Sequence, residues 1–104
     1  MPARTRVEYL PTAARDLREI GRFFIAEVGS QSARKIYQSM RAEIARLREF
    51  PLLGPIHPDP ELAAQEYRML VLTRTYVAVY KVIDGTVYIY RIVNGRTDYP
   101  KLLK

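Results

Sequence analysis

The chain has 104 residues, 48% of them hydrophobic and 27% charged, which predicts one folded domain over residues 1–104. It has no cysteine, one histidine and no apolar run near the ~20 residues of a membrane helix, so we expect a cytoplasmic protein with no metal, no cofactor and no membrane contact. Its net charge of +6, from 17 basic and 11 acidic residues, favours polyanions or acidic proteins as partners.

The chain begins with a pattern for a strand and then one for a helix. Arg4 to Leu10 alternates in polarity and predicts a short strand that ends at Pro11, with Thr12 as the N-cap of the helix that follows. Apolar residues then recur at steps of three and four, which predicts a core-facing stripe of Ala13, Leu17, Ile20, Phe24 and Val28. The charged residues between them, Asp16 included, are expected largely on the solvent side.

A second helix follows almost at once. Gly29 is expected to end the first helix, Ser30 to cap the second, and Phe50-Pro51 to close it. Its apolar stripe consists of Ala33, Ile36, Tyr37, Met40, Ile44 and Leu47. Two helices joined by so short a link form an antiparallel hairpin, and their common apolar side must be covered by another part of the chain.

Prolines dominate the next segment, from Pro51 to Pro60, and predict a loop. Asp59-Pro60-Glu61 can start one helical turn, with Asp59 as N-cap and proline at the first helical position. The single histidine, His57, lies in this loop. No serine or carboxylate pattern supports a catalytic role for it, so we expect a surface histidine.

The C-terminal half reads as strands. Tyr67 to Leu72, Tyr76 to Ile83 and Thr86 to Val93 are strand-like, Asp84-Gly85 is a strong two-residue hairpin signal, and Asn94-Gly95 marks a further turn. The predicted fold class is therefore α+β. An N-terminal strand and a two-helix antiparallel hairpin precede a three-stranded antiparallel meander, which forms one sheet with the helices on one face.

The hairpin also predicts a register. With Asp84-Gly85 as its loop, Ile83 pairs with Thr86, Lys81 with Tyr88, and Val79 with Tyr90. The smoother apolar face, expected against the helices, holds Tyr76, Ala78, Tyr80, Val82, Val87, Ile89, Arg91 and Val93. The other face, expected to be more open, holds Val77, Val79, Lys81, Tyr88, Tyr90 and Ile92. Arg91 fits poorly on the face assigned to the core.

Basic residues alternate with tyrosines through these strands. Arginine can hold phosphate with two hydrogen bonds and tyrosine can stack on a base, so Arg68 and Arg96 are candidates for RNA cleavage by charge stabilisation. The alternative is that strand arginines simply face water and that tyrosine is a favoured strand residue. For Arg74, Lys101 and Lys104 a solvated role is the better interpretation.

The chain resembles the RelE/ParE toxins along nearly its whole length. The resemblance rests on Tyr67-Arg68-Met69-Leu70-Val71-Leu72, Tyr76-Val77-Ala78-Val79-Tyr80 and the run from Val87 to Tyr99, and on Ala14-x-x-Leu17-x-x-Ile20, Ala33, Ile44-x-x-Leu47 and Phe50-Pro51-x-x-Gly54. It implies the toxin of a type II toxin–antitoxin system, neutralised by a cognate antitoxin. From the charge we expect that antitoxin to be acidic and partly disordered, and to lie on the helical hairpin or at a sheet edge.

Two branches share this fold and imply different activities. RelE-like members cleave messenger RNA in the ribosome with basic residues, whereas ParE-like members inhibit DNA gyrase and are not nucleases. Alignment on Tyr76-x-x-x-Tyr80 retains Arg68 and Arg96, but Leu70 and Val77 stand where the RelE pattern has basic groups. Tyr99 also lies closer to Arg96 than that pattern expects.

These departures favour the ParE branch, with growth arrest through gyrase and no catalysis by the toxin. The residues expected to contact the target or partner are then Val77, Lys81, Tyr88, Tyr90 and Arg91. The alternative is a ribosome-dependent endoribonuclease, for which the catalytic candidates are Arg68, Arg96 and Tyr99. A non-toxic basic binding module is the third hypothesis.

Overall fold

A computed structural model describes residues 5–104 of the chain, so Arg4, the expected start of the first strand, lies outside the described residues. The elements in chain order are β1 (Arg6–Tyr9), α1 (Pro11–Val28), α2 (Ser30–Ala45), the 3-10 helix η1 (Arg46–Arg48), α3 (Pro60–Ala64), β2 (Arg68–Val71), η2 (Thr73–Thr75), β3 (Tyr76–Ile83), β4 (Thr86–Asn94) and η3 (Tyr99–Leu102). The α+β class and the order of elements are as predicted.

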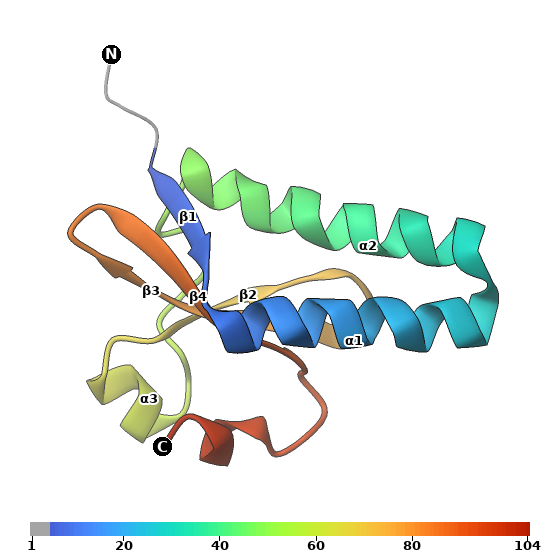
Figure 1. The fold of residues 1–104 in the computed structure, drawn as a ribbon. Coiled ribbons are helices and arrows are strands. Elements are labelled where there is room, and N and C mark those ends of the chain that lie inside the picture. Colours follow the sequence, from blue (N-terminus) through green and yellow to red (C-terminus); the bar gives the residue numbers. More distant parts are fainter. Residues whose placement is uncertain (1–4) are drawn as a thin grey trace.

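The strands form one sheet in the order β1-β4-β3-β2. The predicted meander of β2, β3 and β4 is antiparallel, and β1 joins it as an edge strand parallel to β4. The helical hairpin of α1 and α2 packs on one face of this sheet and its far end projects beyond the strands (Figure 1). No helix of the described chain is both long and apolar enough to span a membrane.

The helix ends differ from prediction, and α2 gives way to η1 before the expected end at Phe50-Pro51. α1 begins at Pro11 with Leu10 as its N-cap, so Thr12 is not the cap. Proline suits the first helical position because its fixed φ is already helical and its missing N–H would have no partner there. Gly29, whose φ is 84°, ends α1 as expected. The same residue is also the N-cap of α2, so Ser30 is the first helical residue and not the cap.

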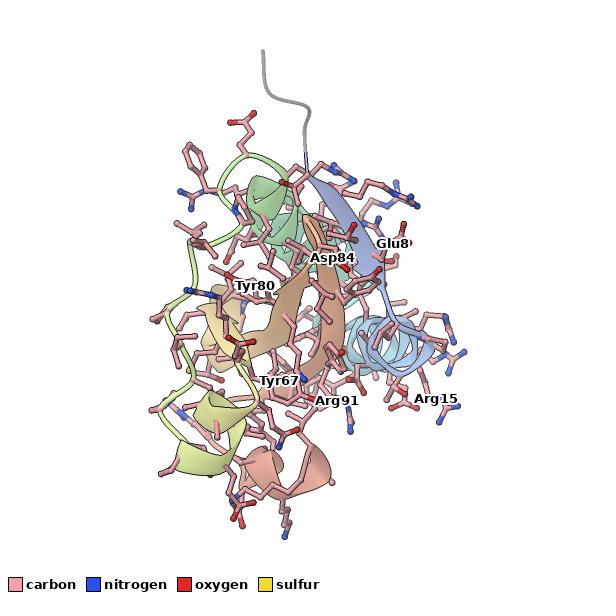
Figure 2. All side chains as sticks on the ribbon, turned by 90° about the vertical axis from the view of Figure 1, so that its left-hand side faces the viewer. Glu8, Arg15, Tyr67, Tyr80, Asp84 and Arg91 are labelled. Carbon is pink, nitrogen blue, oxygen red and sulfur yellow. The ribbon has the colours of Figure 1, made fainter. Side chains whose placement is uncertain are left out.

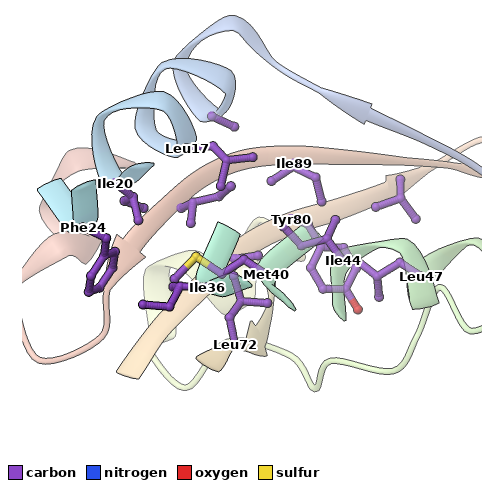
Figure 3. Packing of buried hydrophobic residues seen from close by; sticks show 14 of the residues in the cluster. Leu17, Ile20, Phe24, Ile36, Met40, Ile44, Leu47, Leu72, Tyr80 and Ile89 are labelled. Atoms are coloured by element: carbon purple, nitrogen blue, oxygen red, sulfur yellow. The ribbon is translucent and has the colours of Figure 1, made fainter. Parts of the chain in front are cut away.

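The main core lies between the hairpin and the sheet (Figure 3). Both predicted helix stripes contribute to it, except that Val28 is 45% exposed because it lies at the end of the hairpin. The sheet side is formed by Ala78, Tyr80, Val87, Ile89 and Ile92, with Tyr76 and Val82 packed at its border.

A β-bulge changes the predicted register of the hairpin. Ile83 pairs with Thr86 and Lys81 with Tyr88, as expected, but Val79 pairs with Arg91 and Tyr80 with Ile89. The pairing of Val79 with Tyr90 was therefore wrong. Tyr90 is the extra residue, and one extra residue reverses which side chains face the core beyond it.

Both faces of the sheet differ from the prediction, one because of the bulge and the other because the C-terminal segment covers it. Ile92 lies in the main core and Val93 on the opposite face, the reverse of the prediction. That opposite face is not open, because α3 and η3 fold across it and bury a second cluster of Leu62, Tyr67, Val77, Val79 and Tyr99. The expectation that Val77 and Val79 are exposed was wrong, since a segment distant in sequence covers them.

Candidate functional site

Arg68, the first of the candidate nuclease residues, is held by an internal contact. It pairs with Tyr80 across β2 and β3, and paired residues share a face of the sheet, so it lies on the helix side. Its guanidinium Nη1 donates a hydrogen bond of 2.9 Å to the carbonyl of Gly54. Arg68 therefore fixes the loop after α2 to the sheet.

Tyr80 fixes the same loop from the core. Its hydroxyl accepts a 2.9 Å hydrogen bond from the N–H of Gly54 and donates one of 2.8 Å to the carbonyl of Pro51. Burial raises the pKa of this hydroxyl. A Cβ on Gly54 would lie 2.4 Å from the Met69 carbonyl oxygen, so only glycine fits this close approach. The Phe50-Pro51-x-x-Gly54 pattern thus has a structural role here.

Tyr99, another nuclease candidate, is buried on the opposite face of the sheet, beside Val77 and Val79. Its hydroxyl lies 2.6 Å from Nε2 of His57. The backbone N–H of Asp59 donates to Nδ1 of the same ring, so in the neutral imidazole Nε2 carries the proton and donates to Tyr99. The expectation of a surface histidine was wrong, because His57 is only 4% exposed.

Lys104 links the segment around His57 to the C-terminal part of the chain. Lys104 Nζ lies 3.1 Å from Asp59, whose carboxylate also accepts from the first N–H groups of α3 and caps that helix as predicted. These contacts, the Lys104 hydrogen bond first, lower the pKa of Asp59, and burial lowers the pKa of His57. The assembly ties η3 to α3 and leaves the Tyr99 hydroxyl inside the protein.

Arg96, the last nuclease candidate, is exposed in the turn after β4, where its N–H donates to the side chain of Asn94. Arg68 and Tyr99 lie on opposite sheet faces, and each has an internal hydrogen-bond partner. A charge-stabilising site needs its groups to converge on one position. The three residues do not form such a site, and the described chain has no cluster of three metal-ligating side chains.

The predicted contact residues include one compact polar and aromatic group. Lys81 Nζ lies 4.2 Å from the ring centre of Tyr67 and 5.4 Å from that of Tyr90, and the two rings meet edge to face at 5.1 Å. Tyr88 is paired with Lys81 and is half-buried. We name Lys81, Tyr67, Tyr88 and Tyr90 the lysine–tyrosine face.

Two other predicted contact residues have internal positions. Val77 is buried beneath the C-terminal segment, and Arg91 lies toward α1 (Figure 2), where it forms two hydrogen bonds with Asp16, of 2.8 and 3.1 Å. Asp16 also accepts the N–H of Ile92, so it is buried and not on the solvent side as expected. This pair explains how an arginine is accommodated beside the core.

Comparison with known proteins gives the family. A model of the ParE toxin of the type II toxin-antitoxin system, parDE, matches residues 7–99. The chain belongs to the ParE toxin family. A solved structure described as the chromosomal ParDE TA system from P. aeruginosa is similar in fold, with a TM-score of 0.74 and 22% identity over 86% of this chain and 95% of that one. No curated protein matches the chain.

As a ParE-family member, the chain is the toxin of a type II toxin–antitoxin system, and the RelE-like alternative is not favoured. The sequence reasoning missed two structural residues of this ParE toxin, Asp16 and His57. The sequence held one signal for Asp16. Arg91 was expected on the core face, and an acid beside the apolar stripe of α1 could form an ion pair with it. His57 had none, because its partner is 42 residues away.

Proposed function

We propose that this ParE-family toxin inhibits DNA gyrase by binding it, without cleaving RNA or any other substrate. The observation that supports this proposal is the separation of Arg68 and Tyr99 on opposite faces of the sheet. A binding inhibitor needs no convergent set of charged groups, whereas a charge-stabilised nuclease does. Because gyrase acts on the chromosome, the proposed site of action is the cytoplasm.

The lysine–tyrosine face is our candidate for the gyrase contact. Its lysine is held over the rings of Tyr67 and Tyr90, and these two rings pack against each other, so little freedom of these side chains would be lost on binding. Tyrosine is also enriched among residues that dominate binding energy. Of the other predicted contacts, Val77 is buried in the cluster that contains Tyr67, and Arg91 binds Asp16 of α1, so neither belongs to this candidate surface.

Gyrase supercoiling of relaxed plasmid tests the proposal directly. The purified toxin is expected to inhibit supercoiling, and Lys81→Ala with Tyr88→Ala to weaken that inhibition at least tenfold. A matched control is Lys35→Ala with Arg15→Ala, which removes exposed side chains from the helical hairpin. Toxin that leaves supercoiling unchanged contradicts the gyrase target. Cleaved messages after expression in cells, lost in Arg96→Ala, would instead support the endoribonuclease.

We further propose an acidic, partly disordered antitoxin that lies on the helical hairpin. Ile25, which is 52% exposed, lines a shallow groove together with Gly21, Ala33 and Tyr37, and Val28, 45% exposed, lies at the end of the same helix. An amphipathic segment can place its apolar side in such a groove while its carboxylates meet the basic surface. The sheet edge is the alternative position, since β1 is an edge strand that pairs with β4 alone among the described strands.

Co-purification from the native operon tests the antitoxin and its position. We expect a small acidic protein to remain bound, and Ile25→Asp to weaken its binding far more than Gln38→Asp on the exposed side of α2. If no partner is retained, the antitoxin proposal fails. If a partner is retained equally by both variants, the hairpin position is wrong and the β1 edge becomes the site to test.

A further inference from the structure

Three arginines follow one another along one side of the helical hairpin. Arg34 and Arg41 belong to α2 and Arg48 ends η1, so they are spaced at intervals of seven residues. Seven residues make nearly two helical turns and a rise of about 10 Å, which places successive members on the same side. All three are exposed. We name them the arginine row.

Aromatic contacts join this row to the sheet. The Arg41 guanidinium lies 5.3 Å from the ring centre of Tyr9 in β1 and 6.0 Å from that of Tyr37 in α2. A hydrogen bond to Tyr37 raises the pKa of Arg41, and the charges of Arg41 and Arg48 both oppose the burial that raises the pKa of Tyr9. The middle of the row is therefore held in place over two rings.

The row has no counter-charge in the described part of the chain. None of its members forms an ion pair there, whereas Arg6, Arg91, Lys101 and Lys104 each do. Three shallow hollows along this side contain the row in their walls, and no aspartate or glutamate lines any of them. The result is a strip of exposed positive charge next to grooves that no side chain of opposite charge occupies.

We propose that, in the toxin free of its antitoxin, the arginine row binds the phosphate backbone of duplex DNA when the toxin engages the gyrase–DNA complex; this rests on the proposed gyrase target. A guanidinium can donate two hydrogen bonds to a phosphate and remains charged at every physiological pH. The row is about 20 Å long, which corresponds to roughly six base-pair steps of duplex. Phosphate contacts carry no information about the base sequence, so the proposed contact is independent of DNA sequence.

Fluorescence anisotropy with a labelled 20-base-pair duplex at low salt tests the contact without gyrase. The row variant, Arg34→Ala/Arg41→Ala/Arg48→Ala, is compared with wild type and with the control Arg15→Ala/Arg22→Ala/Lys35→Ala. The control removes the same charge from exposed positions that line none of the three hollows, and Arg15 projects from α1 away from the sheet (Figure 2). Circular dichroism of each variant checks that it is folded.

The salt dependence gives the decisive number. Each phosphate contact adds about 0.9 to the slope of log K against log[salt], so the row variant should lose about 2.7 from that slope and at least tenfold in affinity. The control should keep most of both. Equal losses in the two variants would show a general effect of charge and overturn the proposal. Binding to poly-L-glutamate without binding to the duplex would also overturn it and assign the row to an acidic polypeptide.

The supercoiling assay separates this inference from the function on which it rests. Wild type should inhibit gyrase, and the row variant should inhibit it less well and with a weaker dependence on salt. A row variant that inhibits gyrase as well as wild type overturns the DNA contact and leaves the gyrase target intact. Wild type that does not inhibit gyrase removes the proposed target, while the anisotropy result still decides whether the row binds duplex DNA.

Discussion

Single polar side chains in this toxin take their positions from partners that are distant in the sequence. Asp16 is 75 residues from Arg91, and His57 is 42 residues from Tyr99. In both cases a polar group that local sequence assigns to the surface is buried with its hydrogen bonds satisfied. Burial without such partners would cost about 1–3 kcal/mol for each group. These long-range pairs therefore decide which polar residues the core can contain.

His57 predicts a dependence of stability on pH. Burial lowers its pKa below the ordinary 6.5, so between that lowered value and 6.5 the unfolded chain binds more protons than the folded protein. The free energy of unfolding should therefore fall as the pH drops through 6.5, and the loss should end below the folded pKa. A protonated ring would also direct an N–H at the Asp59 amide, which now donates to Nδ1.

Urea unfolding at several pH values between about 5 and 8 measures this effect. His57→Gln removes the only imidazole of the chain, so its stability should depend less on pH across that window, although it is less stable than wild type at pH 8. The carboxylates are common to both proteins and cancel in the difference. Parallel pH profiles for the two proteins would show that His57 does not titrate as described.

The pair of Asp16 and Arg91 predicts a large coupling. Asp16→Ala leaves Arg91 and the Ile92 N–H without their acceptor and should lower the free energy of unfolding by about 2–3 kcal/mol. In a double-mutant cycle with Arg91→Met, which keeps an apolar stem, the coupling should exceed about 1 kcal/mol. The exposed pair of Arg6 and Glu8 is the control and should couple by less than that. Equal coupling in the two pairs would contradict a structural role for Asp16.

Among the secondary-structure elements, β4 is the one in which alternation of side chains fails to predict the face of every residue. Alternation of period two correctly placed Tyr80 and Ile89 in the main core, because up to that point the register follows from the hairpin loop. Beyond the bulge at Tyr90 the same rule gave the wrong face for Ile92 and Val93. No glycine marks this bulge, and an arginine on a predicted core face was the only local sign of it.

The loop after α2 depends on one buried hydroxyl, which gives a test at the level of this element. Tyr80→Phe removes the acceptor of the Gly54 N–H and the donor to the Pro51 carbonyl, and should cost about 1–3 kcal/mol. Tyr88→Phe is the matched control, since its hydroxyl has no hydrogen-bond partner among the described residues, and should change stability by less than about 0.5 kcal/mol. Similar losses in both variants would mean that the hydroxyl does not hold the loop.

For the molecule as a whole, helical and strand periodicity predicted the fold class and the main core but not the second core. The helix stripes and the hairpin signal arise from residues close together in the chain, so the sequence predicts them. Residues 99–104 pack across the sheet because Tyr99 forms a hydrogen bond with His57 and Lys104 an ion pair with Asp59. No local sequence pattern predicts these two contacts. For the same reason the candidate contact residues were only partly predictable: Lys81 and Tyr88 have the expected face, whereas Val77 is covered.

The two cores share β3, whose side chains alternate between them, and this predicts that they unfold together. Val77 and Val79 belong to the second core, Ala78 and Tyr80 to the main one. Tyr99→Ala empties a buried aromatic site and should cost about 3–5 kcal/mol, a large part of the 5–15 kcal/mol typical of a domain. Because a strand cannot melt on one side only, this loss should destabilise the helical hairpin as much as the C-terminal segment.

Urea transitions followed by far-ultraviolet circular dichroism, which reports the helices, and by tyrosine fluorescence should therefore coincide in Tyr99→Ala and shift together to lower urea. Leu102→Ala, at a side chain that is 56% exposed in the same 3-10 helix, is the control and should shift neither transition by much. If Tyr99→Ala lowered the fluorescence midpoint and left the helical midpoint unchanged, the second core would be an independent unit. The lysine–tyrosine face, which includes Tyr67 of that core, could then be rearranged without unfolding the hairpin proposed to bind the antitoxin.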